Sequence, residues 1–149
     1  MLGIDLDEAC IATARAVAKD NRVGSSIDFE HGDAFDALRS LKAGAHDLIV
    51  LDPPKWILGR DDVDRGLRQY RDLNRLAFEK IRKGGLLVTC SCSGALTESR
   101  FMSLLAETAA EARRDARTVR ISGAGSDHPV ALECPETRYL KVVTMLVGA

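Results

Sequence analysis

The fold is decided by the stretch DLIVLDPPKW, residues 47–56. Its first half, residues 47–51, is a nearly continuous apolar run, as expected for a strand that is buried on both faces of a parallel sheet. The run stops at Asp52-Pro53-Pro54, because two successive prolines cannot continue a hydrogen-bonded ladder. We therefore predict a central strand whose carboxyl end carries an acid held on a rigid turn.

Outward from this strand, short apolar runs alternate with helical patterns, which is typical of an α/β chain with a mostly parallel sheet. Further strands are expected at residues 2–5, 27–30, 86–92, 118–121 and 140–147, and helices after Asp7, over 34–41, over 62–82 and after Thr97. Gly84-Gly85 is expected to end the helix over 62–82. No helical pattern separates the last two strands, which predicts an antiparallel pair at one edge of the sheet.

The composition is that of one globular domain. The chain has 149 residues, of which 46% are hydrophobic and 29% charged, and this excludes general disorder. No apolar run reaches the ~20 residues that span a bilayer, and the N-terminus has no basic region, so neither a transmembrane helix nor a signal peptide is expected. The four cysteines are interpreted as reduced thiols of a cytosolic protein.

The charge is unevenly distributed although the net charge is only −1. Residues 1–54 hold five basic and ten acidic side chains, and the segment from Arg60 to Lys83 holds eight basic and five acidic ones. Such a basic segment either follows a phosphate backbone or is a solvated helix face with salt bridges, and the sequence leaves both open.

Two acids follow the first two predicted strands. Ligands of open α/β sheets bind at the carboxyl ends of the strands, where Asp5 could accept hydrogen bonds from ribose hydroxyls. In Gly32-Asp33-Ala34-Phe35, Asp33 could bind an adenine amino group while Phe35 packs beneath it. The alternatives are an exposed or helix-capping Asp5 and a helix start capped by Asp33.

Two further motifs follow the central strands. Asp52-Pro53-Pro54-Lys55-Trp56 places an acid, a rigid turn and a cation together, and Trp56 could stack on a base. In Thr89-Cys90-Ser91-Cys92-Ser93-Gly94, Cys92 would lie beside the same crevice if the two strands are neighbours.

The two cysteines of this motif allow more than one interpretation. Lys55 could favour the thiolate of Cys92, whereas Cys90 lies deeper in the strand and is expected to pack. Both could instead be buried structural cysteines, or half of a metal site with His128 and Cys134. C-x-C is a poor zinc spacing, so no metal is expected.

The order of these motifs resembles the catalytic domain of bacterial large-subunit ribosomal RNA methyltransferases that make 5-methylcytosine. The resemblance covers essentially the whole chain and rests on Asp5, Gly-Asp-Ala-Phe (32–35), Asp-Pro-Pro-Lys (52–55), Ser-Cys-Ser-Gly (91–94), Asp-His-Pro-Val (127–130) and Tyr-Leu-Lys (139–141). It implies a Rossmann-like class I methyltransferase sheet, mostly parallel with a C-terminal antiparallel hairpin. It also implies S-adenosylmethionine as cofactor and large-subunit ribosomal RNA as partner.

The resemblance implies a role for each motif residue. Cys92 would be the nucleophile that adds to cytosine C6, Asp52 would hold the base edge and stabilise the adduct, and Lys55 would contact the base or a phosphate. The target base must leave its stack to reach such a site. The implied cofactor-binding residues are Asp5, Leu6, Asp33, Ala34, Asp52 and Pro53.

The chain departs from the family at its start. The strand and glycine-rich loop that precede Asp5 in the family have no counterpart here, and that strand would lie in the middle of the sheet. We therefore expect residues 1–149 to be a partial catalytic domain with two unpaired inner strand edges, inactive or nearly so by itself. Alternatives are a methyltransferase acting on a guanine nitrogen or another RNA atom, and a non-catalytic RNA-binding remnant. Monomer and homo-oligomer both stay open.

Overall fold

The computed structural model describes residues 1–148 and divides them into two units, Met1–Leu41 and a second unit that begins at Lys42. In the first unit, β1 (Leu2–Asp5) pairs in parallel with β2 (Asp28–His31), and α1 (Glu8–Asp20) connects them. α2 (Ala34–Ser40) follows β2. These are the elements that the sequence predicts, with β2 beginning one residue later than expected.

Helix α1 starts at the predicted cap. Oδ1 of Asp7 accepts hydrogen bonds from the backbone N–H groups of Ala9 (2.8 Å) and Cys10 (3.3 Å). These bonds favour the charged carboxylate, so they hold the pKa of Asp7 below its ordinary value. The first free N–H groups of the helix are satisfied in this way.

The second unit is built on a four-stranded sheet in the order β3-β4-β6-β5. Its strands are β3 (His46–Leu51), β4 (Ile81–Ser91), β5 (Ala116–Ser122) and β6 (Lys141–Val147). β3 and β4 are parallel, whereas β6 runs antiparallel to both β4 and β5. The predicted antiparallel pair at the sheet edge is confirmed.

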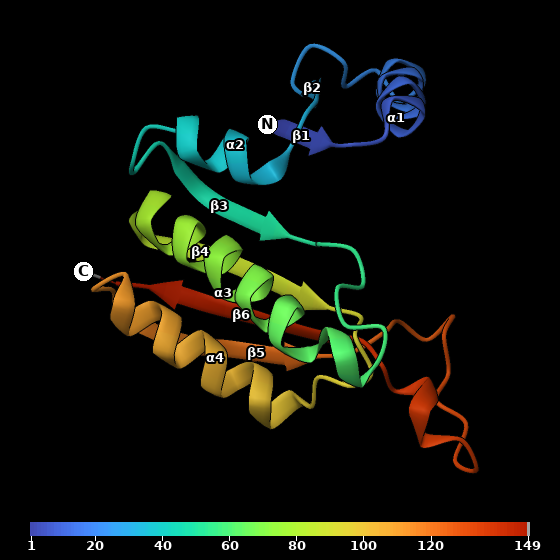
Figure 1. Ribbon diagram of the computed structural model, residues 1–149. Helices are drawn as coiled ribbons and strands as arrows, with labels where there is room; N and C mark the ends of the chain where they lie inside the picture. Colours follow the sequence, from blue (N-terminus) through green and yellow to red (C-terminus); the bar gives the residue numbers. More distant parts are fainter. Residues whose placement is uncertain (149) are drawn as a thin grey trace. The chain divides into compact units, whose positions relative to one another are not determined.

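Two helices, α3 (Val63–Lys80) and α4 (Glu98–Glu111), lie on one face of this sheet (Figure 1). Between helices and sheet lies a core of fully buried side chains that includes Tyr70, Phe78, Phe101, Leu87 and Val143. The short 3-10 helices η1 (Arg60–Asp62) and η2 (Pro135–Thr137) lie in the connections.

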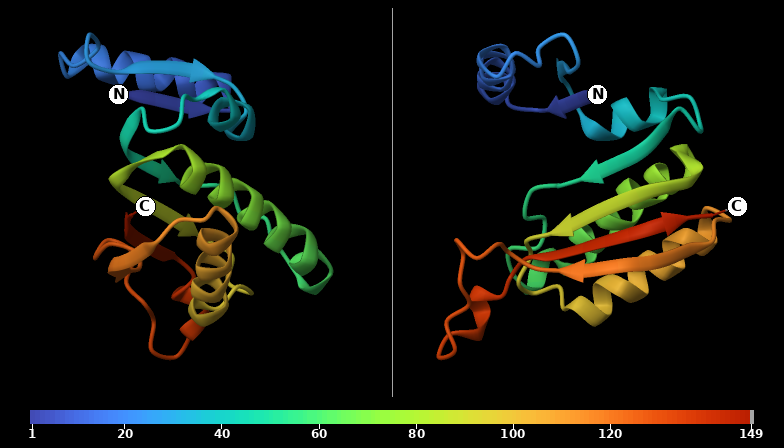
Figure 2. Two further views of the ribbon diagram at one scale, coloured as in Figure 1. Left: turned by 90° about the vertical axis from the view of Figure 1, so that its left-hand side faces the viewer. Right: turned by 180° about the vertical axis from the view of Figure 1, so that it is seen from behind.

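The other face of the four-stranded sheet carries no helix of the second unit (Figure 2). Exposed apolar side chains from three strands lie on this face, namely Leu48, Val50, Leu86 and Leu146. The prediction of a central strand buried on both faces is therefore wrong for the described residues: β3 is an edge strand of this sheet, and α3 and α4 cover only one of its faces.

One predicted boundary is wrong. Gly84-Gly85 does not end a helix, because α3 ends at Lys80 and both glycines lie within β4. Ile81 is buried and pairs with His46, which draws the chain into the sheet directly after the helix. Gly84 has φ of 79°, and a Cβ at Gly85 would meet the carbonyl oxygens of Arg82 and Asp47 at 2.9 Å. The glycines therefore serve an irregular strand start.

The predicted open strand edges are present. Within residues 1–148, β1 is hydrogen-bonded only to β2, and β3 only to β4. None of the described helices has the length and apolarity needed to cross a membrane.

Candidate active site at the carboxyl end of the four-stranded sheet

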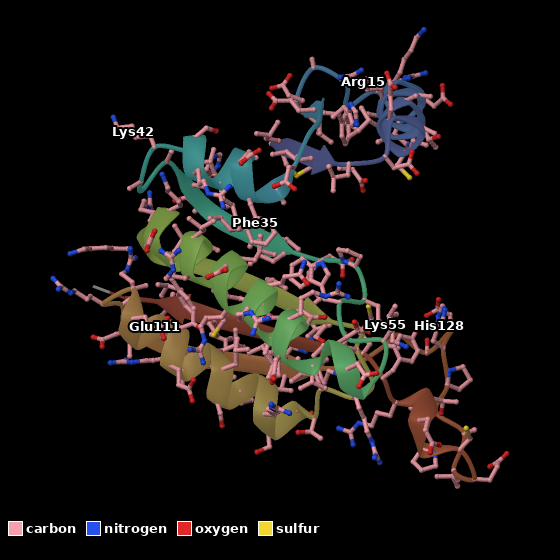
Figure 3. All side chains as sticks on the ribbon, viewed as in Figure 1. Arg15, Phe35, Lys42, Lys55, Glu111 and His128 are labelled. Carbon is pink, nitrogen blue, oxygen red and sulfur yellow. The ribbon has the colours of Figure 1, made fainter. Side chains whose placement is uncertain are left out.

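Topology brings the motifs of the second unit to one end of its sheet. β3 and β4 are parallel, so Asp52 and Cys92, which directly follow them, emerge at the same end. β6 runs antiparallel to β4, so its first residue, Lys141, lies at the same end. The loop that connects β5 to β6 lies there as well. Lys55 and His128 both lie at this end (Figure 3). The predicted neighbourhood of the Asp-Pro-Pro-Lys and Ser-Cys-Ser-Gly motifs follows from this pairing.

Buried hydroxyl groups hold both residues that flank Cys92. Ser91 Oγ donates to the Tyr70 hydroxyl at 3.0 Å, which shares a further hydrogen bond of 3.1 Å with Ser93 Oγ. The backbone N–H of Ser93 donates to Ser91 Oγ at 3.3 Å. All three of these side chains are fully buried, whereas Cys92 is half-buried. The thiol therefore emerges from a fixed backbone.

The same network holds the proline-rich loop after β3. The backbone N–H of Ile57, itself buried, donates to Ser93 Oγ at 3.2 Å. The Trp56 ring packs edge-on against Tyr70, with ring centroids 4.9 Å apart. The two motifs thus meet on Tyr70 and Ser93. Trp56, proposed above as a stacking platform for a base, has part of its ring engaged in this packing.

The acid and the cation of the loop face solvent. Asp52 and Lys55 are exposed, whereas Pro53 between them is buried and anchors the turn. The carboxylate of Asp52 contributes to raising the pKa values of Tyr70 and Cys90, after burial, which is the larger cause for both. An exposed carboxylate on a buried turn is available to hydrogen-bond a ligand.

The two cysteines of the motif differ in environment. Cys90 is 9% exposed, and burial is the main reason that its pKa rises from the ordinary 9.0 to about 11. This confirms its expected packing role, since such a thiol stays protonated at neutral pH. Cys92 is the accessible thiol of the pair.

Lys141 closes the site from β6. Its Nζ donates to the carbonyl oxygens of Ser93 and Tyr139, both at 2.7 Å, and the residue is only 6% exposed. Burial lowers the pKa of its ammonium group, because the charged form is poorly solvated there. The backbone carbonyl of Ser93, the residue after Cys92, is therefore held in place by a buried cation.

The sequence did not assign these supporting residues. Tyr70 lies in the stretch predicted as a helix over 62–82, and a tyrosine hydroxyl needs a hydrogen-bond partner when it is buried, which was the available signal. Lys141 shares a strand face with the buried Val143 and Met145, so alternation alone places a lysine in the core. A buried lysine requires hydrogen-bond partners, which the strand pairing then supplies.

The predicted cofactor residues Asp5, Leu6, Asp33 and Ala34 belong to the first unit. Oδ1 of Asp5 accepts the N–H of Asp7 at 2.7 Å, and Leu6 is exposed. Oδ1 of Asp33 accepts the N–H groups of Phe35 (2.8 Å) and Asp36 (3.2 Å). Asp33 is thus the cap of α2, which was the alternative interpretation.

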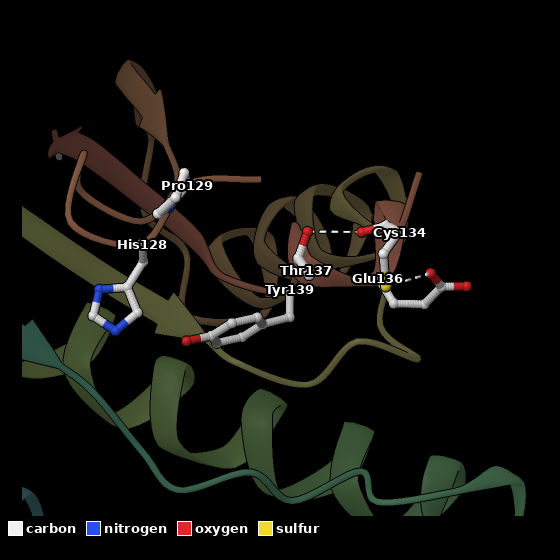
Figure 4. Close-up of a pocket in the computed structure, with 6 residues that line it drawn as sticks. All are labelled: His128, Pro129, Cys134, Glu136, Thr137 and Tyr139. Carbon is white, nitrogen blue, oxygen red and sulfur yellow. Dashed lines mark hydrogen bonds between the residues drawn. The ribbon is translucent and has the colours of Figure 1, made fainter. Parts of the chain in front are cut away.

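A pocket of about 410 Å³ lies in the loop between β5 and β6 (Figure 4). Its lining residues are His128, Pro129, Cys134, Glu136, Thr137 and Tyr139. Nδ1 of His128 pairs with the exposed carboxylate of Asp127 at 3.0 Å, and Cys134 Sγ donates to Glu136 at 3.5 Å. Among residues 1–148, no three His, Cys, Asp or Glu side chains gather into a group that could hold a metal ion.

Several basic side chains between Arg60 and Lys83 form ion pairs. The pairs are Arg65–Asp62, Arg71–Glu107, Arg71–Glu111, Arg75–Glu79 and Arg82–Asp47, at 2.6 to 3.5 Å. This arrangement favours the interpretation of the segment as a solvated face with salt bridges.

No protein-family model matches the chain. The curated ribosomal RNA large subunit methyltransferase I of Aeromonas salmonicida is 37% identical over 144 residues, which make up 95% of this chain and 36% of that protein. The protein of the same name from Escherichia coli is 33% identical over a stretch of the same length and coverage. The chain therefore spans little more than a third of the length of these relatives.

The fold matches solved structures. A crystal structure of SMU.776, described as a methyltransferase complexed with SAH, superposes with a TM-score of 0.80 at 21% identity. The match covers 97% of this chain and 38% of that one. The predicted fold class is confirmed: the chain has the α/β fold with a mixed sheet of class I methyltransferases, over part of their length.

Proposed function

We propose that this chain is the catalytic part of an S-adenosylmethionine-dependent methyltransferase that makes 5-methylcytosine in large-subunit ribosomal RNA, with Cys92 as the nucleophile. The observation that carries the proposal is the accessible Cys92 on a fixed backbone, at the same sheet end as the Asp52 turn. The name of the curated relatives supports the ribosomal RNA substrate.

The proposed reaction requires a nucleophile that activates the cytosine ring, and a thiol can provide it. C5 of cytosine is too weak a nucleophile to take a methyl group unaided. Addition of the Cys92 thiolate to C6 makes C5 nucleophilic, and loss of the C5 proton later restores the double bond and expels the thiolate. Because an unperturbed thiol is mostly protonated at neutral pH, the reaction needs a group that stabilises the thiolate.

The other residues bind and orient. Asp52 is exposed beside the thiol loop and would accept a hydrogen bond from the amino edge of the base. Lys55 would contact the base or a phosphate. The base must reach this site flipped out of any stack.

The first unit fits part of the cofactor. Asp5 and Asp33 each use Oδ1 in a local backbone turn, and Oδ2 has no further hydrogen bond with the described residues. Asp5 would accept from the ribose hydroxyls and Asp33 from the adenine amino group, with Leu6 and Ala34 beside them. When bound, S-adenosylmethionine supplies an electrophilic methyl group.

The test compares Cys92→Ala with Cys134→Ala, which removes an exposed thiol elsewhere. Both are placed in a chimera in which the matched 144 residues replace the corresponding stretch of the Aeromonas salmonicida relative. We expect Cys92→Ala to lose 5-methylcytosine formation by at least ~10³-fold with unchanged cofactor affinity, because the nucleophile acts only in the chemical step. Cys134→Ala should behave as the parent chimera.

Methyl transfer that survives Cys92→Ala would reject the covalent mechanism. If the methyl group is then found on a ring nitrogen, the chain belongs to the alternative class of RNA methyltransferases. RNA binding without any cofactor dependence would instead indicate a non-catalytic remnant.

A further inference from the structure

Lys141 is the only buried charged side chain among the described residues of the chain. Lysine is almost never fully buried unless it is paired, because desolvation penalises its charge. Its two hydrogen-bond acceptors are carbonyl groups, and no carboxylate among residues 1–148 lies within 4.0 Å of its Nζ. The fold therefore holds a cation whose positive charge has no ion-pair partner.

The position of this cation is set by the sheet. In the β4–β6 ladder Lys141 pairs with Ser91, the residue before Cys92. The Nζ of Lys141 donates to the backbone carbonyl of Ser93, the residue after Cys92. The ammonium group is therefore hydrogen-bonded to the backbone of the loop that carries Cys92. After burial, the groups that act on its charge are the Cys92 thiol and Glu98 at the start of α4.

We infer that Lys141 is a positioning residue that provides the counter-charge for the thiolate of Cys92 and fixes the loop carrying it. Its use in catalysis rests on the proposed function, whereas the electrostatic pairing does not. The sequence suggested Lys55 for this role, but Lys55 is exposed to water, which weakens its electrostatic effect. A buried cation acts through a medium of lower dielectric constant.

Other titratable groups surround the loop. They are Asp52 after β3, Tyr70 on α3, Cys90 on β4 and Glu98 on α4. Asp52 and Glu98 are acidic side chains, and a nearby carboxylate disfavours a thiolate. Tyr70 and Cys90 have raised pKa values and stay neutral. Lys141 is thus the positive group that burial and hydrogen bonding hold against this loop.

The test measures the ionisation of Cys92 directly. In a Cys10→Ser/Cys134→Ser background, the rate of alkylation of Cys92 by iodoacetamide is followed against pH by peptide mass spectrometry. Lys141→Gln keeps a hydrogen-bond donor but removes the charge, and Lys141→Arg keeps the charge. Lys83→Met removes an exposed charge at the other end of β4 and serves as control.

We expect Lys141→Gln to lower the rate of alkylation of Cys92 about tenfold at neutral pH, because loss of the positive charge disfavours the thiolate. Lys141→Arg and Lys83→Met should stay near the parent. If the midpoint of the alkylation rate of Cys92 against pH is unchanged in a folded Lys141→Gln protein, the inference is overturned. If methyl transfer survives Cys92→Ala while Lys141→Gln still shifts the midpoint, the proposed function fails and the pairing stands.

A second pair of variants does not depend on Lys141→Gln folding. Cys92→Asp places a permanent carboxylate beside Lys141, and Cys92→Asn is its neutral isostere. The pairing predicts a higher thermal midpoint for Cys92→Asp than for Cys92→Asn at pH 7, with the difference lost as the pH falls through the carboxylate pKa. An equal or lower midpoint for Cys92→Asp would contradict it.

Discussion

At the scale of single residues, two cysteines two positions apart differ in burial and therefore in their access to reagents. Cys90 is buried and its pKa is raised to about 11, whereas Cys92 emerges at the end of the strand. Alkylation at pH 8 should therefore modify Cys92 and spare Cys90 in the folded protein, and both should react after unfolding. Equal labelling of the two thiols in the folded state would contradict this assignment.

The same shift gives a pH dependence of stability. The folded pKa of Cys90 lies above its ordinary value of 9.0, so folding favours the neutral thiol. The contribution of Cys90 to the free energy of unfolding is fully present below pH 9 and is lost as the pH rises through about 11. Urea unfolding of the parent and of Cys90→Ala at pH 8 and pH 11 measures it, since the substitution should reduce the alkaline loss.

The sequence predicted some residues of the site and not others, for a physical reason. Asp52 and Cys92 could be placed because the carboxyl ends of neighbouring parallel strands meet at one edge. Lys141 could not, because its role depends on the pairing of Ser91 with Lys141 and on the Ser93 carbonyl. That register is a property of the folded sheet.

At the scale of elements, a glycine inside α3 determines how closely the helix approaches the proline-rich loop. Gly66 is buried, and a Cβ there would overlap Ile57 Cγ1 and meet the carbonyl oxygen of Trp56 at 3.1 Å. Ile57 is itself fully buried and cannot move aside. The loop that carries Asp52 is therefore packed directly on the helix backbone.

We expect Gly66→Ala to destabilise the protein by about 1–3 kcal/mol, since overpacking outweighs the ~1 kcal/mol gain in helix propensity. Gly59→Ala is the matched control, because Gly59 lies in the loop before α3 and nothing lies within 4 Å of a Cβ at that position. Urea unfolding measures the free energy of unfolding of both variants, and the comparison holds when their m values are equal to that of the parent. A Gly66→Ala protein as stable as the parent would show that the loop can shift.

Elements with long apolar or periodic patterns were predicted well. β3 and α4 form where their patterns predict them, although β3 is buried on one face only. The Thr97 cap of α4 is present, with its hydroxyl oxygen accepting from the N–H of Arg100 at 3.2 Å. The end of α3 was misplaced because Gly84-Gly85 has the composition of a helix stop. The helix ends before Ile81 because Ile81 is buried and pairs with His46 in the sheet, and neither contact can be read from the local sequence.

At the scale of the whole molecule, the chain has a class I methyltransferase fold over little more than a third of the length of its relatives. The order of the motifs was sufficient to predict the fold class. Within residues 1–148, β1 pairs only with β2 and β3 only with β4, and such open edges were also predicted from the sequence. Because the match covers 36% of the relative, the proposed catalysis is tested in the chimera with that relative.

The central claim is that Cys92 bonds covalently to cytosine, and trapping of that bond tests it most directly. The chimera is incubated with S-adenosylmethionine and a large-subunit ribosomal RNA fragment that contains 5-fluorocytidine. Fluorine at C5 blocks the final proton loss, so the account predicts a stable protein–RNA complex linked through Cys92. Methylation of the unmodified fragment without any such complex from the fluorinated one would contradict the account.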